Sequence, residues 1–98
     1  MTLPRDPMDA GLAAQFDLVR KQFLTSLARR AREIDEAPDQ RALQAALHQL
    51  AGAAGSFGHP ELSEMARRAM RAIDTGDTHA LEVALERLRA TMRALGPP

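Results

Sequence analysis

The sequence contains no cysteine, tryptophan or tyrosine, and it has no long apolar run. The absence of cysteine excludes disulfides, thiolate metal sites and thiol nucleophiles. The N-terminus lacks a basic segment followed by an apolar core, and no apolar run approaches the roughly 20 residues of a membrane span. Thirteen acidic residues balance thirteen basic ones, whereas a nucleic-acid binder of this size is usually markedly basic. We therefore expect a soluble, cytoplasmic protein that binds neither membrane nor nucleic acid.

The residues that are abundant, alanine, leucine, arginine and glutamate, favour helix over strand. The 98 residues suffice for one domain with a single core. Residues 1–8 carry two prolines and little apolar periodicity, so we expect a flexible lead-in there and a single domain over residues 9–96.

The first apolar stripe at helical spacing follows Asp9, a residue type that caps helix N-termini. The span to Glu36 is long for one helix. It is compatible with one continuous helix or with a short extra N-terminal helical segment before a break. The stripe consists of Leu12, Phe16, Val19, Phe23, Leu27 and Ile34.

Three further amphipathic segments follow, separated by short connections at 37–39, 58–60 and 76–77 that are rich in proline, glycine and aspartate. Short connections make sequential helices antiparallel neighbours. The sequence therefore predicts an all-α fold, an up-down-up-down antiparallel four-helix bundle. Because the bundle uses every apolar stripe and leaves no large apolar face spare, we expect a monomer.

A histidine faces away from the apolar side of the second of these helices. At about 100° per residue, His48, Gly52 and Gly55 fall on one side, nearly opposite the leucine stripe. A mid-helix glycine costs roughly 1 kcal/mol relative to alanine, and core packing does not explain glycines that face water. An incidental surface histidine is the simpler interpretation, but the glycines indicate that something outside the helix comes close to the imidazole.

Such an imidazole suits phosphoryl transfer. Neutral imidazole is available near pH 7 and can accept a phosphoryl group on a ring nitrogen and give it up again. In-line transfer requires the partner to approach along the imidazole direction. Bulky side chains at positions 52 and 55 would obstruct that approach.

The run His48-Gln49-Leu50-Ala51-Gly52, with Gly58 after it, resembles the histidine-containing phosphotransfer (HPt) domains of bacterial phosphorelays. Their motif is His-x-Leu-Lys-Gly, followed by a glycine six residues after the first. The resemblance implies the same helical bundle, with His48 as the phosphorylated residue. It also implies a partner, the receiver domain of a response regulator or hybrid sensor histidine kinase, which supplies an aspartate and Mg²⁺. HPt domains have no ATP site, so the chain is expected to be a phosphocarrier without a cofactor of its own rather than an enzyme.

Two positions depart from that family. Ala51 stands where many members have a lysine near the phosphate, and Met70 where an acidic residue or glutamine often occurs. Arg67 or Arg71 could supply the missing charge, because guanidinium pairs well with phosphate oxygens; a solvated helix face is the alternative for each. The other residues expected beside the phosphate or in the partner's docking surface are Gln44, Gln49, Gly52 and Gly55.

Two other functions compete with the phosphocarrier. The absence of a lysine at position 51 would suit a helical adaptor that binds or sequesters a receiver domain without being phosphorylated. A metal site has little support, because neither His59 nor His79 lies three or four residues from another histidine. We expect both to be cap or loop residues.

Overall fold

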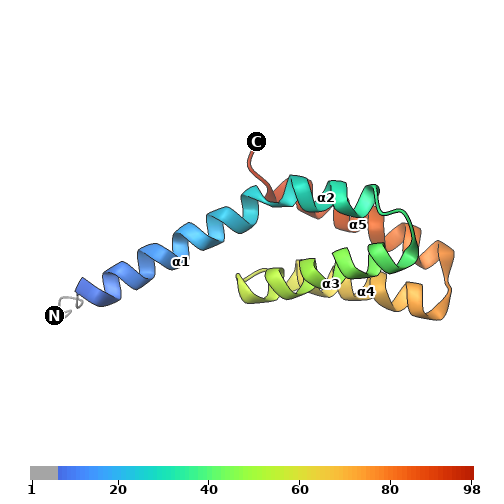
Figure 1. Cartoon of the computed structure of the whole chain (residues 1–98), viewed down its shortest axis with the longest axis horizontal. Coiled ribbons are helices and arrows are strands. Elements are labelled where there is room, and N and C mark those ends of the chain that lie inside the picture. Colours follow the sequence, from blue (N-terminus) through green and yellow to red (C-terminus); the bar gives the residue numbers. More distant parts are fainter. Residues whose placement is uncertain (1–6) are drawn as a thin grey trace.

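The structure, a computed structural model, describes residues 7–98. Its five helices are α1 (Pro7–Thr25), α2 (Leu27–Asp35), α3 (Gln40–Ser56), α4 (Pro60–Thr75) and α5 (Thr78–Leu95), and the described range contains no strand. Helices α2 to α5 run alternately in opposite directions and form a four-helix bundle (Figure 1). The predicted all-α bundle is therefore confirmed. Most of the expected lead-in, residues 1–6, lies outside the described residues, and α1 already includes Asp9 rather than beginning after it.

The connections of the bundle form as the sequence predicts. The carboxylates of Asp39 and Asp77 accept hydrogen bonds from the N–H groups of the third residues after them, at 2.8 Å and 3.0 Å, and so cap α3 and α5. Gly58 and Gly76 end α3 and α4 with φ of +83° and +70°, values that favour glycine. Pro60 occupies the first turn of α4, where a missing N–H costs little.

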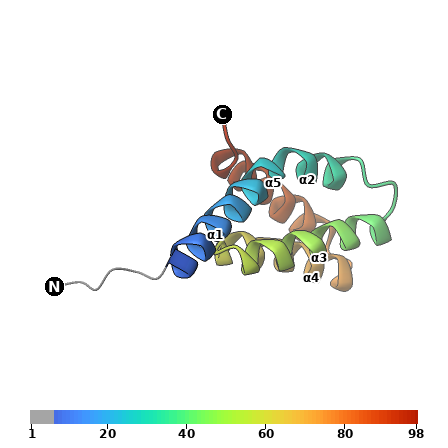
Figure 2. The ribbon, with the colours of Figure 1, turned by 60° about the vertical axis from the view of Figure 1, so that its left-hand side comes forward.

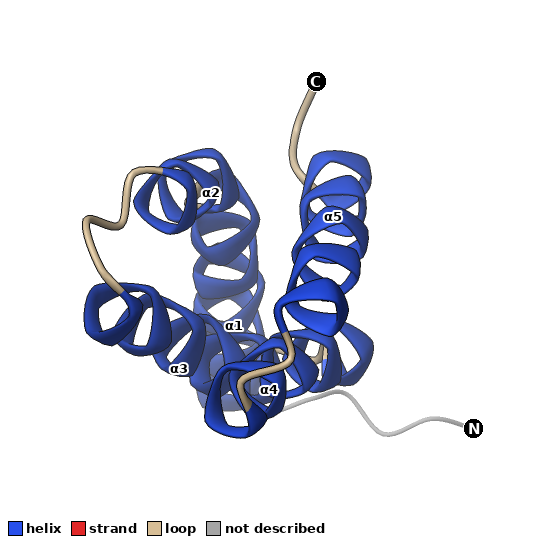
Figure 3. Ribbon diagram, turned by 90° about the vertical axis from the view of Figure 1, so that its right-hand side faces the viewer, coloured by secondary structure: helices blue, strands red, loops and turns tan. Residues whose placement is uncertain are grey.

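The core lies among α2, α3, α4 and α5, whose arrangement is seen end-on in Figure 3. Helix α4 is central because it packs extensively on both α3 and α5. The surfaces that meet include many alanines, which allow the helices to approach closely. The most deeply buried apolar residues are Phe23, Leu27, Ile34, Leu47, Leu50, Ala51, Ala54, Leu62, Ala66, Ala69, Leu88 and Met92.

Helix α1 leaves the bundle and projects past its end (Figures 1 and 2). Phe16 is 60% exposed and Leu12 51%, with Leu18 and Val19 also exposed. The prediction of one buried stripe from Leu12 to Ile34 was therefore wrong in its first half. The premise that no apolar face is left over was wrong as well. No described helix has the length and apolar content required to span a membrane.

The break that directs α1 away lies at Ser26, between two helices that otherwise form one element. Ser26 Oγ donates a 2.6 Å hydrogen bond to the carbonyl of Phe23, and Thr25 Oγ1 donates to the carbonyl of Lys21 at 2.9 Å. Hydroxyls that bond back to the preceding turn compete with the backbone ladder and bend helices. Of the two alternatives left open by the sequence, one continuous helix or a short leading segment before a break, the structure has the break, but the leading helix is the longer one, with 19 residues against 9.

Candidate functional site

His48 lies near the middle of α3, with its side chain exposed at the boundary between α3 and α4. Gly52 and Gly55 follow it on the same helix and are also exposed, as their spacing predicts. The helix is anchored from its opposite side, because Leu47, Leu50 and two alanines of the following turn are buried. The fold therefore holds the backbone of His48 rigidly while its imidazole faces outward.

The glycines beside His48 are not required by packing within the chain. A Cβ atom at Gly52 would meet nothing within 4 Å. A Cβ atom at Gly55 would lie 3.5 Å from Ser63 Oγ, an ordinary van der Waals contact. Both positions have ordinary helical backbone, so alanine would fit and would favour the helix. The space above them is left open toward the outside of the molecule.

Two hydrogen bonds fix how α4 lies against α3. Gln44 Nε2 donates to Asp74 Oδ1 at 2.9 Å, and Ser63 Oγ donates to the carbonyl of Ala51 at 2.8 Å. Because the helices are antiparallel, His48 lies level with the part of α4 between Ser63 and Asp74. This register places α4 residues, which are far from His48 in the sequence, alongside it.

One row of α4 residues faces this boundary. Ser63, Arg67, Met70 and Asp74 are separated by four, three and four residues, which places them on one helix face. Since Asp74 at one end of the row contacts Gln44 and Ser63 at the other end contacts Ala51, His48 lies roughly level with the middle of the row, between Arg67 and Met70. Arg67 is exposed, whereas Met70 is half-buried and packs against the core.

Arg71, the second predicted cation, lies one turn after Arg67, farther from the centre of this row, and is bonded to a carboxylate of its own helix. It lies 100° around the helix from Met70, and its guanidinium donates to Glu64 Oε1 at 2.7 Å. The hydrogen bond from Arg71 lowers the pKa of the Glu64 carboxyl, and the charges of Arg71 and Arg68 lower it further. Arg71 is thus held in an ion pair on the outer side of α4. Arg67 is the better placed of the two beside His48.

The remaining predicted residues differ in their exposure. Gln49 is exposed, but it lies 100° around α3 from His48, away from the row on α4. Ala51 is only 2% exposed, so its methyl group packs in the core and forms no part of the open surface. Sequence reasoning did not identify Ser63 and Asp74, because their relation to His48 depends on the register of the two helices.

The other candidate groups lie apart from His48. His59 is half-buried and stacks on Phe23, with ring centroids 5.6 Å apart. It occupies the N-cap position of α4, and His79 lies in the first turn of α5. Among the described residues, no three His, Cys, Asp or Glu side chains gather where they could hold a metal ion.

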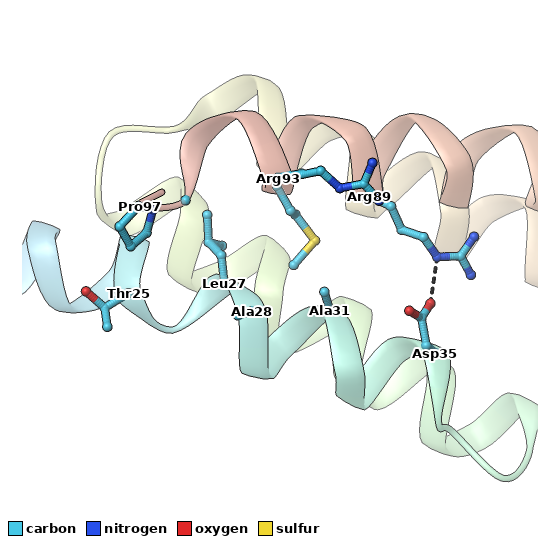
Figure 4. Close-up of a pocket in the computed structure, with 10 residues that line it drawn as sticks. Thr25, Leu27, Ala28, Ala31, Asp35, Arg89, Arg93 and Pro97 are labelled. Carbon is cyan, nitrogen blue, oxygen red and sulfur yellow. Dashed lines mark hydrogen bonds and ion pairs between the residues drawn. The ribbon is translucent and has the colours of Figure 1, made fainter.

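A groove of about 310 Å³ runs between α2 and α5, the pair of helices on the other side of the bundle (Figure 4). The ion pair between Arg89 Nε and Asp35 Oδ1, at 2.6 Å, lies at one end of this groove. Its walls are mostly small or apolar side chains and contain no histidine. We therefore locate the candidate functional site at His48 and not in the groove.

Comparison with known protein families finds a match over most of the chain. A family model described as "Hpt domain" matches residues 18–96, which include the whole of the bundle and His48. The match leaves out the first part of α1. No curated protein and no solved structure matches the chain in the corresponding comparisons.

Proposed function

This chain belongs to the Hpt domain family, and from that premise we propose that it is a phosphocarrier of a two-component phosphorelay. His48 accepts a phosphoryl group from the aspartate of a receiver domain and passes it on to another. The observation that carries the proposal is the open space beside an exposed histidine. A Cβ atom at Gly52 would meet nothing within 4 Å, yet the position is occupied by a residue that weakens the helix.

The chemistry of the transfer is divided between the two proteins. A ring nitrogen of His48 forms a bond to phosphorus while the bond from phosphorus to the aspartate oxygen breaks, and its electron pair returns to the carboxylate. The receiver domain supplies the aspartate and Mg²⁺, and this chain supplies the nucleophile and the docking surface. We propose that it has no ATP site or cofactor of its own, and that it acts in the cytoplasm.

Mixing the protein with a phosphorylated receiver domain tests the proposal. We expect phosphate to move to the chain in a form that is labile in acid and stable in base, as phosphohistidine is. His48→Gln should abolish this product and leave the circular dichroism spectrum unchanged, since residue 48 is exposed. A phosphate that persists in His48→Gln would contradict the assignment.

The second candidate function is an adaptor that binds a receiver domain without being phosphorylated. The observation in its favour is Ala51, a buried methyl group where many family members have a lysine. The same mixing experiment distinguishes the two functions. If the receiver domain binds but no phosphate is transferred from any receiver of a panel, the adaptor is correct.

We propose that Arg67 supplies the positive charge that position 51 does not. Its place in the row that faces α3 supports this, whereas Arg71 is already bonded to Glu64. Arg67→Gln should slow phosphoryl transfer by roughly tenfold, the effect of losing one charge-assisted contact. Arg71→Gln, the matched control on the same helix, should change the rate by less than about twofold. Equal effects of the two substitutions on the single-turnover rate would contradict a specific role for Arg67.

A further inference from the structure

The side chain of Gln44 is fixed in a particular orientation one helical turn before His48. Its amide nitrogen donates to the carboxylate of Asp74 on the neighbouring helix at 2.9 Å. An ionised carboxylate only accepts hydrogen bonds, so it must face the NH₂ group of the amide and not its oxygen. The contact therefore fixes which end of the Gln44 amide faces Asp74. It leaves Oε1 of Gln44 free to accept another hydrogen bond.

Few other side-chain oxygens can approach the imidazole of His48. On α3, the positions three and four residues away are Gln44, Ala45, Ala51 and Gly52, and of these only Gln44 has a side-chain oxygen. On α4, the row between Ser63 and Asp74 consists of Arg67 and Met70, neither of which offers an oxygen. Ser63 is itself buried and bonded to α3. Among the positions on α3 and α4 considered above, Gln44 is therefore the one with a side-chain oxygen that is free to accept a hydrogen bond from the imidazole.

We infer that Gln44 is a positioning residue for His48, with its amide held by Asp74 and its Oε1 accepting a hydrogen bond from Nδ1–H. Residues four apart on a helix have Cβ atoms about 5–6 Å apart, within reach of such a bond. A neutral imidazole carries one proton, so a proton kept on Nδ1 leaves the lone pair on Nε2. Nε2 is the ring nitrogen farther from the backbone and therefore the one that a docking partner meets first.

The same hydrogen bond has a role in the transfer step, and this part of the inference rests on the proposed function. When Nε2 bonds to phosphorus and the aspartate oxygen leaves with its electron pair, the proton on Nδ1 remains and the ring becomes positively charged. A carbonyl oxygen facing Nδ1–H stabilises this cation more than it stabilises the neutral ring. Gln44 would thus favour both the reactive tautomer and the phosphorylated product.

The tautomer of His48 in the unphosphorylated protein gives a direct test by ¹⁵N-edited NMR of the imidazole nitrogens. An unrestrained histidine in water carries its proton mainly on Nε2, so a predominant Nδ1–H form at His48 is the expected signature. Gln44→Met should return His48 to the Nε2–H form. Gln49→Met, the same substitution at an exposed glutamine that faces away from α4, should not.

Asp74 provides a second arm of the experiment. Asp74→Ala releases the amide of Gln44 and should reduce the Nδ1–H population. The exchange Gln44→Glu with Asp74→Asn reverses donor and acceptor across the two helices and should restore that population. Single-turnover transfer from a receiver domain should be roughly tenfold slower in Gln44→Met, with receiver affinity unchanged, and should recover in the double variant.

The tautomer is measured without phosphate, so it remains informative if the proposed function fails. An Nε2–H tautomer in the wild-type protein would overturn the inference. So would an Nδ1–H tautomer that survives in Gln44→Met, because the acceptor would then be another group, such as a backbone carbonyl of α3. Failure of transfer in the wild-type protein, with the Nδ1–H form present, would overturn the proposed function and leave the positioning role intact.

Discussion

Helices α1 and α4 are similar in length, with 19 and 16 residues, and both carry apolar side chains at helical spacing. Their burial is nevertheless opposite. In α4, Leu62, Ala66 and Ala69 are almost completely buried, whereas Phe23 is the only buried residue among the described side chains of α1. Apolar spacing predicted both helices, although the apolar and polar faces of α1 are much less sharply separated than those of α4. The stripe alone did not show which of the two helices has a surface to pack against.

The difference comes from the connections of the two helices. Helix α4 lies between two short connections, each with a glycine in the left-handed region, and these force it to fold back on both neighbours. Helix α1 has a neighbour at one end only, and the back-bonded hydroxyls of Thr25 and Ser26 bend it away from that neighbour. The connections at the two ends of a helix therefore determine its position as much as its own apolar face does.

The largest expected consequence is a difference in local stability. Isolated helices of this length are marginal in water, and most helical stability in proteins comes from packing. We expect the amide hydrogens between Leu12 and Val19 to exchange at least about a thousandfold faster, relative to their intrinsic rates, than those of Ala66 and Ala69. Hydrogen exchange followed by NMR measures both sets in one sample. Equal protection would show that α1 is packed in solution, against the bundle or against a second copy.

Shortening one leucine in each helix should show a smaller contrast of the same kind. Leu62→Ala should lower the free energy of unfolding by about 3 kcal/mol, because it opens a cavity at a side chain that is 1% exposed. Leu12→Ala, its counterpart on α1, should lower it by less than about 0.5 kcal/mol, since most of that side chain already contacts water. Urea denaturation gives both values. Similar losses would contradict the exposed position of α1.

The bundle could be predicted from the sequence because local signals and the global fold agree in it. Asp39, Gly58, Gly76 and Asp77 mark helix ends by their own backbone chemistry, and the stripes between them face one core. The position of α1 could not be predicted from its stripe. The adjacent hydroxyls of Thr25 and Ser26 were the available sign of a bend, although they do not tell where the bend points.

Only the part of the candidate site that lies on α3 could be predicted from the sequence. The positions of His48, Gly52 and Gly55 on one exposed face follow from helical spacing alone. The contact between Gln44 and Asp74, which are 30 residues apart, depends on how α3 and α4 are aligned. The same alignment distinguishes Arg67 from Arg71, and it depends on close packing of alanines that no local pattern specifies.

Two matched glycines, one in α1 and one in the bundle, make it possible to compare the two regions in their effect on function. Gly11 in α1 and Gly52 in α3 are both exposed, and a Cβ atom at either would meet nothing within 4 Å. Replacing either by glutamine should favour the helix by up to roughly 1 kcal/mol, with little effect on the rest of the molecule. They differ in that only Gly52 lies one turn from His48.

The most direct test of the open face at His48 is therefore the rate of phosphoryl transfer from a receiver domain to Gly52→Gln, with Gly11→Gln as its control. We predict that Gly52→Gln is at least as stable as the wild-type protein in urea but is phosphorylated at least about tenfold more slowly, because the new side chain obstructs the partner. Gly11→Gln should be phosphorylated at the wild-type rate. Wild-type transfer in Gly52→Gln would contradict the claim that this face of α3 is kept open for a phosphoryl donor.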